Sequence, residues 1–168
     1  SDLAFRFPAH HCVIAGAPNF DESYYKQYMG EADLPVVFNA TYDLLKHAEA
    51  AVVASGTATL ETALLNVPQV VVYKANPLSI AIGRMVIQVK YISLVNLILD
   101  KPAVRELIQK ECTTEEIAAE LDRLLNKKAY REQVFADYTT LHQKMGEPGA
   151  SGRTAQLITN FLGRQTED

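Results

Sequence analysis

The chain has 168 residues, 48% hydrophobic and 21% charged, which suits one soluble globular domain with a sizeable core. The net charge is −4 and no Lys/Arg-rich tract occurs, so we expect no nucleic-acid partner. No signal peptide is visible, and no apolar run is long enough to span a bilayer. The two cysteines, Cys12 and Cys112, lack the spacing of a metal site, which favours a reducing cytoplasm.

Short apolar runs alternate with helical patterns through the first half of the chain. The expected strands are 11–16, 35–38, 50–54 and 70–73, and the expected helices are 21–29 begun by Asp21, 42–48 capped by Thr41, and one that follows Thr57. This alternation predicts an α/β, Rossmann-like fold: a parallel sheet with helices on both faces. Ligands of such folds bind at the carboxyl ends of the strands.

The most informative feature is the turn Ser55-Gly56-Thr57, between the strand 50–54 and the helix that carries Thr59 and Glu61. A helix N-terminus offers unpaired N–H groups and a positive dipole end, so we expect this turn to bind a diphosphate, with Thr59 assisting. Glu61, one turn inside the helix, is placed to accept hydrogen bonds from ribose hydroxyls. Two simpler interpretations remain: an ordinary helix start with a packing glycine, and a solvated Glu61.

Helical patterns dominate the second half of the chain. The stretch 77–90 is apolar apart from Arg84 and Lys90, and Glu106 and Gln109 are expected at the start of a helix. Thr113 and Glu116 form a capping-box pattern. The first expected helix points Ile117, Leu121, Leu124 and Leu125 inward, and the second points Val134, Tyr138, Leu141 and Met145 inward. A break follows at 146–149. Ser151 is then expected to cap a last helix, with Leu157, Ile158, Phe161 and Leu162 inward.

Two blocks of sequence carry a family resemblance. The block SGTATLE, followed by the strand QVVVYK, resembles the nucleotide-binding half of two-Rossmann-domain (GT-B type) glycosyltransferases. The block 89–121 resembles the lipid-A-disaccharide synthases through Tyr91, Ser93, Leu94, Asn96, Leu97, Glu106, Leu107 and Gln109. That family usually has Pro before the Asn, where this chain has Val95. The resemblance covers about residues 11–163.

The resemblance also assigns roles to residues outside the turn. It implies that Gly16 and Ala17 approach the nucleotide, and that Asn96, Glu106 and Gln109 line the donor-sugar side. The residues alone leave other interpretations open. Asn96 could be an internal amide that braces a loop, because a buried amide must find partners. Glu106 and Gln109 could be ordinary polar residues of a helix N-terminus.

The resemblance implies that residues 1–168 are a single C-terminal domain that binds the donor, UDP-diacylglucosamine, and that the N-terminal acceptor domain is absent from this chain. The chain begins with Ser1-Asp2 rather than Met, so we expect preceding sequence. The implied reaction transfers 2,3-diacylglucosamine from UDP to the lipid acceptor 2,3-diacylglucosamine 1-phosphate, with inversion, forming a β-1,6 bond. No catalytic base is evident in this chain, so we expect the base on the other domain and no activity from this fragment alone.

Several expectations concern partners and ions. The resemblance implies a cytoplasmic protein with peripheral contact to the inner membrane of a Gram-negative bacterium, and a homodimer is compatible with it. The stretch 77–90 could make the membrane contact or could be a buried helix. We expect no metal or cofactor: Asp43 and His47 are interpreted as a solvated ion pair, and His10 and His11 as structural residues.

Two alternatives to this function remain. One is another UDP-sugar enzyme half of the same fold, either an epimerase or a peptidoglycan glycosyltransferase, which would share the turn but not the block from Tyr91 to Gln109. The other is a non-enzymatic, flavodoxin-like binding module.

Overall fold

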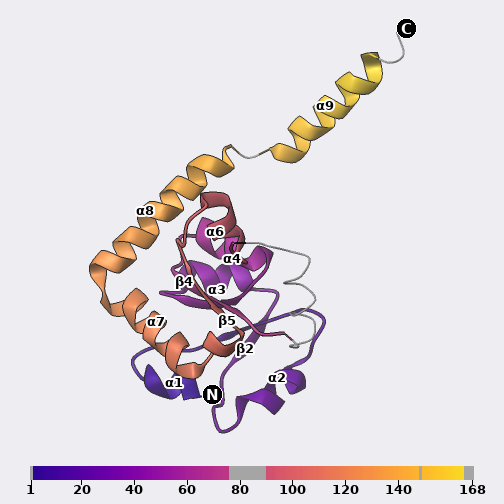
Figure 1. The fold of residues 1–168 in the computed structure, drawn as a ribbon. Coiled ribbons are helices and arrows are strands. Elements are labelled where there is room, and N and C mark those ends of the chain that lie inside the picture. The colour runs from indigo at the N-terminus through magenta and orange to yellow at the C-terminus, as the bar shows by residue number, and fades with distance from the viewer. Residues whose placement is uncertain (1, 76–89, 148, 165–168) are drawn as a thin grey trace.

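The computed structural model describes residues 2–75, 90–147 and 149–164. In chain order these residues form α1 (Asp2–Arg6), β1 (Ile14–Gly16), α2 (Glu22–Met29), β2 (Val36–Phe38), α3 (Thr41–His47), β3 (Ala51–Ala54), α4 (Thr57–Leu64), β4 (Gln69–Tyr73), α6 (Leu94–Leu99), β5 (Arg105–Ile108), the 3-10 helix η1 (Gln109–Glu111), α7 (Thr114–Asn126), α8 (Lys128–Met145) and α9 (Ala150–Arg164). The α/β class predicted from the sequence is confirmed (Figure 1).

All strand pairs in the described residues are parallel. β1 pairs with β2, and β3, β4 and β5 form a second sheet in that order, with Val53 opposite Val71 and Val72 opposite Leu107. The two sheets do not pair with each other in the described part of the chain. Residues of β1 and β3 line one common cavity.

Neighbouring residues of β4 contribute to two hydrophobic cores, because side chains of a strand alternate between its faces. Val70 packs with Leu107 of β5 and Leu121 of α7. Val71 packs in the larger core, whose other buried members come mainly from α4, α6 and α8, including Ala63, Val95, Leu99, Val134, Tyr138 and Leu141. Helices therefore cover both faces of this sheet, as the sequence predicts.

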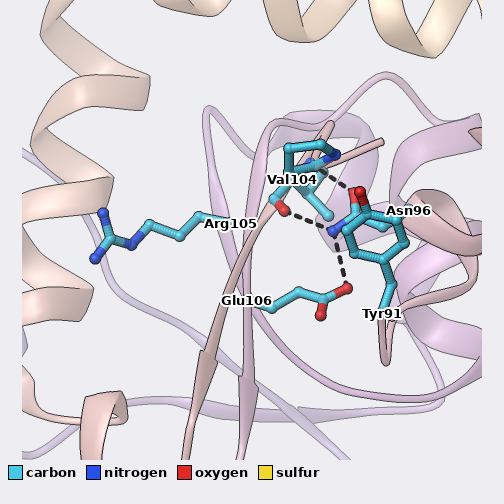
Figure 2. Close-up of a pocket in the computed structure, with 6 residues that line it drawn as sticks. Tyr91, Asn96, Val104, Arg105 and Glu106 are labelled. Atoms are coloured by element: carbon cyan, nitrogen blue, oxygen red, sulfur yellow. Dashed lines mark hydrogen bonds between the residues drawn. The ribbon is translucent and has the colours of Figure 1, made fainter. Parts of the chain in front are cut away.

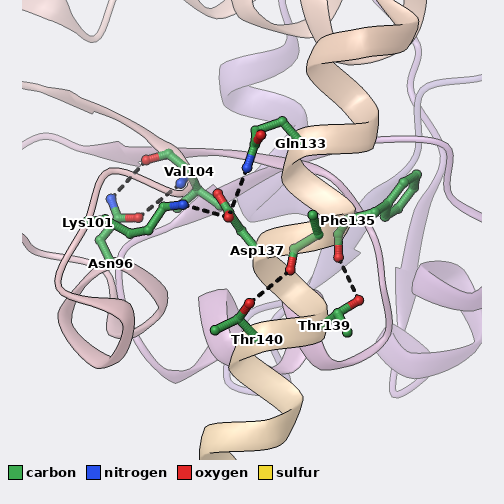
Figure 3. A network of polar contacts seen from close by, with 9 residues as sticks. Asn96, Lys101, Val104, Gln133, Phe135, Asp137, Thr139 and Thr140 are labelled. Atoms are coloured by element: carbon green, nitrogen blue, oxygen red, sulfur yellow. Dashed lines mark hydrogen bonds and ion pairs between the residues drawn. The ribbon is translucent and has the colours of Figure 1, made fainter.

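A network of hydrogen bonds and an ion pair links α8 to the α6–β5 connection (Figure 3). The ammonium group of Lys101 lies 2.6 Å from Oδ1 of Asp137, whose side chain is only 9% exposed. Gln133 donates a hydrogen bond to the same oxygen at 3.1 Å. A buried carboxylate needs such partners, because leaving it unpaired would be costly. The network thus fixes α8 beside the segment that carries Asn96.

Two sequence predictions about elements and one about an ion pair are wrong. Glu106 lies in strand β5, not at a helix start, because the segment Arg105–Ile108 pairs with β4 and buries Leu107 completely. Helix α3 begins at Thr41 after an N-cap at Ala40, so Thr41 does not cap it. Asp43 pairs with Lys46 at 3.2 Å, and not with the next-turn residue His47.

The last helix differs most from expectation. α9 extends away from the rest of the chain (Figure 1). The four residues predicted to point inward, Leu157, Ile158, Phe161 and Leu162, are instead 55–70% exposed. Ser151 lies inside α9 and does not cap it. The amphipathic pattern is real, but no part of the described chain covers its apolar face.

Candidate functional site

The predicted strand–turn–helix motif is present at the carboxyl end of β3. The backbone N–H of Ser55 donates to the carbonyl of Val72 at 3.0 Å, which holds the turn on the sheet. Gly56 is the N-cap of α4, and no side chain caps the helix there. A Cβ added at Gly56 would meet no atom of the described residues within 4 Å. The first N–H groups of α4 therefore lack the side-chain acceptor that caps many helices.

The three hydroxyl groups of this turn have different surroundings. The hydroxyl of Ser55 donates to the carbonyl of Ile92 at 2.9 Å. The hydroxyl of Thr59 is fully buried and donates to the carbonyl of Gly56 at 2.8 Å. Thr57 is exposed, and its hydroxyl has no partner among the described residues. Because a hydroxyl has a single proton to donate, Thr57 is the hydroxyl still available to a ligand.

Glu61 is partly buried and lines a cavity of about 1070 Å³. The cavity walls come from β1 and the loop after it, from β3, and from α3 and α4, and include the loop residues Gly16 and Ala17. The Glu61 carboxylate has no hydrogen bond or ion pair within the described residues. A carboxylate without partners on a cavity wall is free to accept hydrogen bonds from a bound molecule.

Close packing and one hydrogen bond fix the loop after β1. A Cβ at Gly16 would lie 2.4 Å from Cε1 of the Phe38 ring, so the neighbouring strand requires glycine there. The backbone N–H of Ala17 donates to the hydroxyl of Tyr25 at 2.6 Å. The sequence places Tyr25 in a helix by its spacing from Tyr24 and Tyr28, but does not reveal this bond, because Ala17 lies in a different element.

His10, interpreted from the sequence as structural, also lines the large cavity. Its Nε2 lies 3.7 Å from Oε2 of Glu49, and its Nδ1 is buried without a partner among the described residues. No group of three or more His, Cys, Asp or Glu residues in the described part of the chain is arranged to hold a metal ion.

Glu106, in contrast to Glu61, has several hydrogen-bond partners, and Figure 2 shows the bond from Asn96. Its Oε1 accepts hydrogen bonds from the backbone N–H of Ser93 at 2.9 Å, the Ser93 hydroxyl at 2.7 Å and the side-chain amide of Asn96 at 2.8 Å. Its Oε2 accepts from the backbone N–H of Ile92 at 3.0 Å. Four donors thus surround this carboxylate, which borders a smaller cavity of about 310 Å³.

Asn96 uses both ends of its buried amide within the chain. Nδ2 donates to the carbonyl of Val104 at 2.8 Å as well as to Glu106, and Oδ1 accepts from the backbone N–H of Val104 at 2.9 Å. These bonds match the loop-bracing role that the sequence left open. Figure 2 shows Arg105 directed away from this group; it pairs with Glu116 at 2.7 Å.

Gln109 joins the end of β5 to the end of β4. Its Nε2 donates to the carbonyl of Ala75 at 2.9 Å. Its φ of 54° lies in the left-handed region, which is uncommon for a residue other than glycine, asparagine or aspartate. Gln109 and Glu106 therefore hold the backbone on either side of residues 76–89.

The stretch 77–90, considered for membrane contact, lies outside the described residues except for Lys90. In the described chain, no helix has both the length and the apolar character needed to cross a membrane.

The structure thus brings the predicted residues into two groups. Gly16, Ala17 and Glu61 share the large cavity, while Asn96 and Glu106 share the smaller one. Ser55 links the groups, because it lies in the turn before α4 and bonds to Ile92 beside Glu106.

Comparison with known proteins identifies the relatives of this chain. A family model described as lipid-A-disaccharide synthetase matches residues 2–159. Similar curated proteins, each named lipid-A-disaccharide synthase, come from Syntrophus aciditrophicus (44% identical over 153 residues), Geobacter sulfurreducens (37% over 133) and Persephonella marina (37% over 155). The alignments cover 89%, 79% and 88% of this chain.

The same alignments cover 40%, 35% and 41% of the three relatives, so the chain spans about two fifths of the length of these proteins. The match to the family model, in contrast, extends over nearly the whole chain. The chain therefore belongs to the lipid-A-disaccharide synthetase family.

Proposed function

We propose that this chain is the C-terminal, UDP-sugar-binding half of a lipid-A-disaccharide synthase. The complete protein would transfer 2,3-diacylglucosamine from UDP to 2,3-diacylglucosamine 1-phosphate. Family membership supports the reaction. The assignment to the donor half is supported by the turn at Gly56 and Thr57, which opens a helix at the carboxyl end of a parallel strand, the usual position of nucleotides in such sheets.

The observation that carries the proposal is the position of Glu61. Glu61 lines the large cavity together with Gly16 and Ala17, and its carboxylate has no partner in the described chain. A ribose has two neighbouring hydroxyl groups, which can both donate to one carboxylate. We therefore assign Glu61 to the ribose and the loop at Gly16 and Ala17 to the nucleotide.

The diphosphate would bind at the N-terminus of α4. The N–H groups of the first turn and the helix dipole favour an anion, and the exposed Thr57 hydroxyl adds a donor. The same groups would stabilise the negative charge that UDP gains as it leaves the sugar. Thr59 would contribute indirectly, because its hydroxyl holds the Gly56 carbonyl inside the turn.

The donor sugar would lie on the side of Asn96, Glu106 and Gln109. Since the side chains of these residues bond to the chain itself, we assign them to shaping this side rather than to the chemistry. The base that deprotonates the acceptor hydroxyl would come from the remainder of the protein. Both substrates carry acyl chains, so the full protein would work at a membrane surface, with residues 77–90 as a candidate contact.

Calorimetry with three ligands tests the donor-half assignment. The chain should bind UDP, should bind uridine more weakly, and should not prefer FMN. Thr57→Val should weaken UDP binding about tenfold or more, since a hydrogen bond to a charged group contributes roughly 1.5–3 kcal/mol. Uridine binding should not change, because uridine lacks the diphosphate. Thr154→Val on exposed α9 is the matched control. Preferential FMN binding would overturn the proposal.

A second test concerns activity. Incubated with donor and acceptor lipids, this chain should release no UDP above background, and it should bind UDP more weakly than the full-length protein, because each half of a two-domain cleft supplies part of the contact. Turnover at about 1 per second or faster, a rate typical of enzymes, would contradict the assignment of the base to the other half.

A further inference from the structure

The backbone of Ile92 is held from two directions by residues far away in the sequence. The carbonyl of Ile92 accepts a hydrogen bond from the Ser55 hydroxyl at 2.9 Å. Its N–H donates to Oε2 of Glu106 at 3.0 Å. Ile92 thus connects the turn before α4 to strand β5. We call these two contacts the Ile92 bridge.

The Glu106 end of the bridge is rigidly supported. Asn96 donates to Oε1 of Glu106 at 2.8 Å, and both ends of its amide bond to the backbone of Val104. Ser93 adds two further donors to Glu106, from its N–H and its hydroxyl. Asn96 and Ser93 are each no more than 1% exposed. Such a fully satisfied buried network tends to adopt one arrangement.

The Ser55 end of the bridge lies beside the proposed diphosphate site. Ser55 has one hydroxyl proton, and this proton is used on Ile92. A phosphate oxygen has no proton to give at neutral pH, so it could bond to this hydroxyl only if the bond to Ile92 were broken. Thr57, two residues along, has no such bond among the described residues. The two hydroxyls of the turn are therefore suited to different roles.

We propose that Ser55 and Glu106 are positioning residues that act as one unit, through the Ile92 bridge, to fix the turn that binds the diphosphate. Neither side chain touches the ligand in this arrangement. The inference rests on the proposed function, because it concerns the same turn. It revises the roles expected from the sequence, which assigned Ser55 to the diphosphate and Glu106 to the donor sugar.

A double-mutant cycle on UDP binding tests this coupling. Ser55→Ala and Glu106→Gln should each weaken UDP binding by about 5- to 10-fold. The double variant should be no weaker than the worse single variant by more than about twofold, because both changes break the same bridge. The matched control pairs Thr57→Val with Glu106→Gln, and the two fold-losses should multiply, since Thr57 acts on the ligand directly. Multiplying losses for Ser55 and Glu106 would overturn the proposal and make Ser55 a direct ligand.

A measurement without ligand separates this inference from the proposed function. Hydrogen exchange of the Ile92 and Ser93 amides should become faster in Ser55→Ala and remain unchanged in Thr57→Ala. The measurement does not require Glu106 variants, so it holds even where Glu106→Gln fails to fold. If the wild-type chain binds no UDP, the proposed function fails, while faster exchange in Ser55→Ala alone still supports the bridge. Unchanged exchange in Ser55→Ala would overturn the bridge whatever UDP does.

Discussion

Glu61 and Glu106 are both partly buried carboxylates beside cavities, yet their surroundings differ in every other respect. Glu61 borders the larger cavity and has no partner in the described chain. Glu106 borders the smaller one and accepts four hydrogen bonds. A carboxylate that already has its donors contributes to folding, while one without them can serve a ligand. The described residues thus contain an open region around Glu61 and a closed region around Glu106.

The largest expected effect breaks the closed region. Asn96→Ala should lower the free energy of unfolding by about 2–4 kcal/mol, because it removes three hydrogen bonds and leaves Val104 with buried, unpaired backbone groups. Urea unfolding measures this loss. Asn160→Ala, on exposed α9, is the control and should change little. Equal stability of Asn96→Ala and the wild-type chain would show that the closed region does not support the fold.

A smaller effect tests whether the wall of the open region is rigid. Gly16→Ala should cost about 1–3 kcal/mol of stability, because the added Cβ would lie 2.4 Å from the Phe38 ring. Gly152→Ala, where a Cβ meets no atom within 4 Å, should not destabilise the chain. A smaller side chain in place of the Phe38 ring should make room for the added Cβ. Phe38→Leu combined with Gly16→Ala should therefore recover part of the lost stability. Failure of any recovery would mean that the clash with Phe38 is not the cause.

The smallest expected effect lies outside both regions. Replacing Leu157 and Phe161 of α9 with Ser should change the unfolding free energy of this chain by no more than about 0.5 kcal/mol for each substitution, since both side chains are more than 60% exposed. Thermal or urea unfolding of the double variant provides the measurement. A loss above about 2 kcal/mol would show that α9 packs against the chain after all.

The sequence predicted the parts of the fold that depend on local pattern. The strand–turn–helix at Ser55 to Glu61 and the Asp21 cap of α2 are present. The capping box predicted at Thr113 is only half formed: the Glu116 N–H donates to the Thr113 hydroxyl, but the Thr113 N–H donates to the carbonyl of Glu111 and the Glu116 carboxylate pairs with Arg105. The sequence predicts a helix start at Glu106 and Gln109, because polar residues three apart share one face of a helix. Pairing with β4, which no local pattern reveals, makes Arg105–Ile108 a strand instead.

The organisation of the candidate site depended on long-range contacts. Ser55 and Ile92 are 37 residues apart, and Gln109 and Ala75 are 34 apart, so no local pattern reveals these bonds. The apolar stripe of α9 was visible as periodicity, but periodicity does not tell which surface covers a helix face. Similarly, the difference between Glu61 and Glu106 follows from the hydrogen-bond donors that folding brings to Glu106 and not to Glu61. The sequence alone does not show which of these two carboxylates has donors around it.

The central claim is that Glu61 serves a ligand and not the fold. The most direct test measures Glu61→Gln twice, by UDP calorimetry and by urea unfolding, with Glu132→Gln on α8 as the control. The unfolding free energy should stay within about 0.5 kcal/mol of wild type. UDP binding should weaken by roughly 1–3 kcal/mol, about 5- to 160-fold in Kd, because a charge-assisted hydrogen bond becomes a neutral one. Unchanged UDP affinity, measured where the wild-type chain binds detectably, would contradict the claim and make Glu61 an ordinary helix carboxylate.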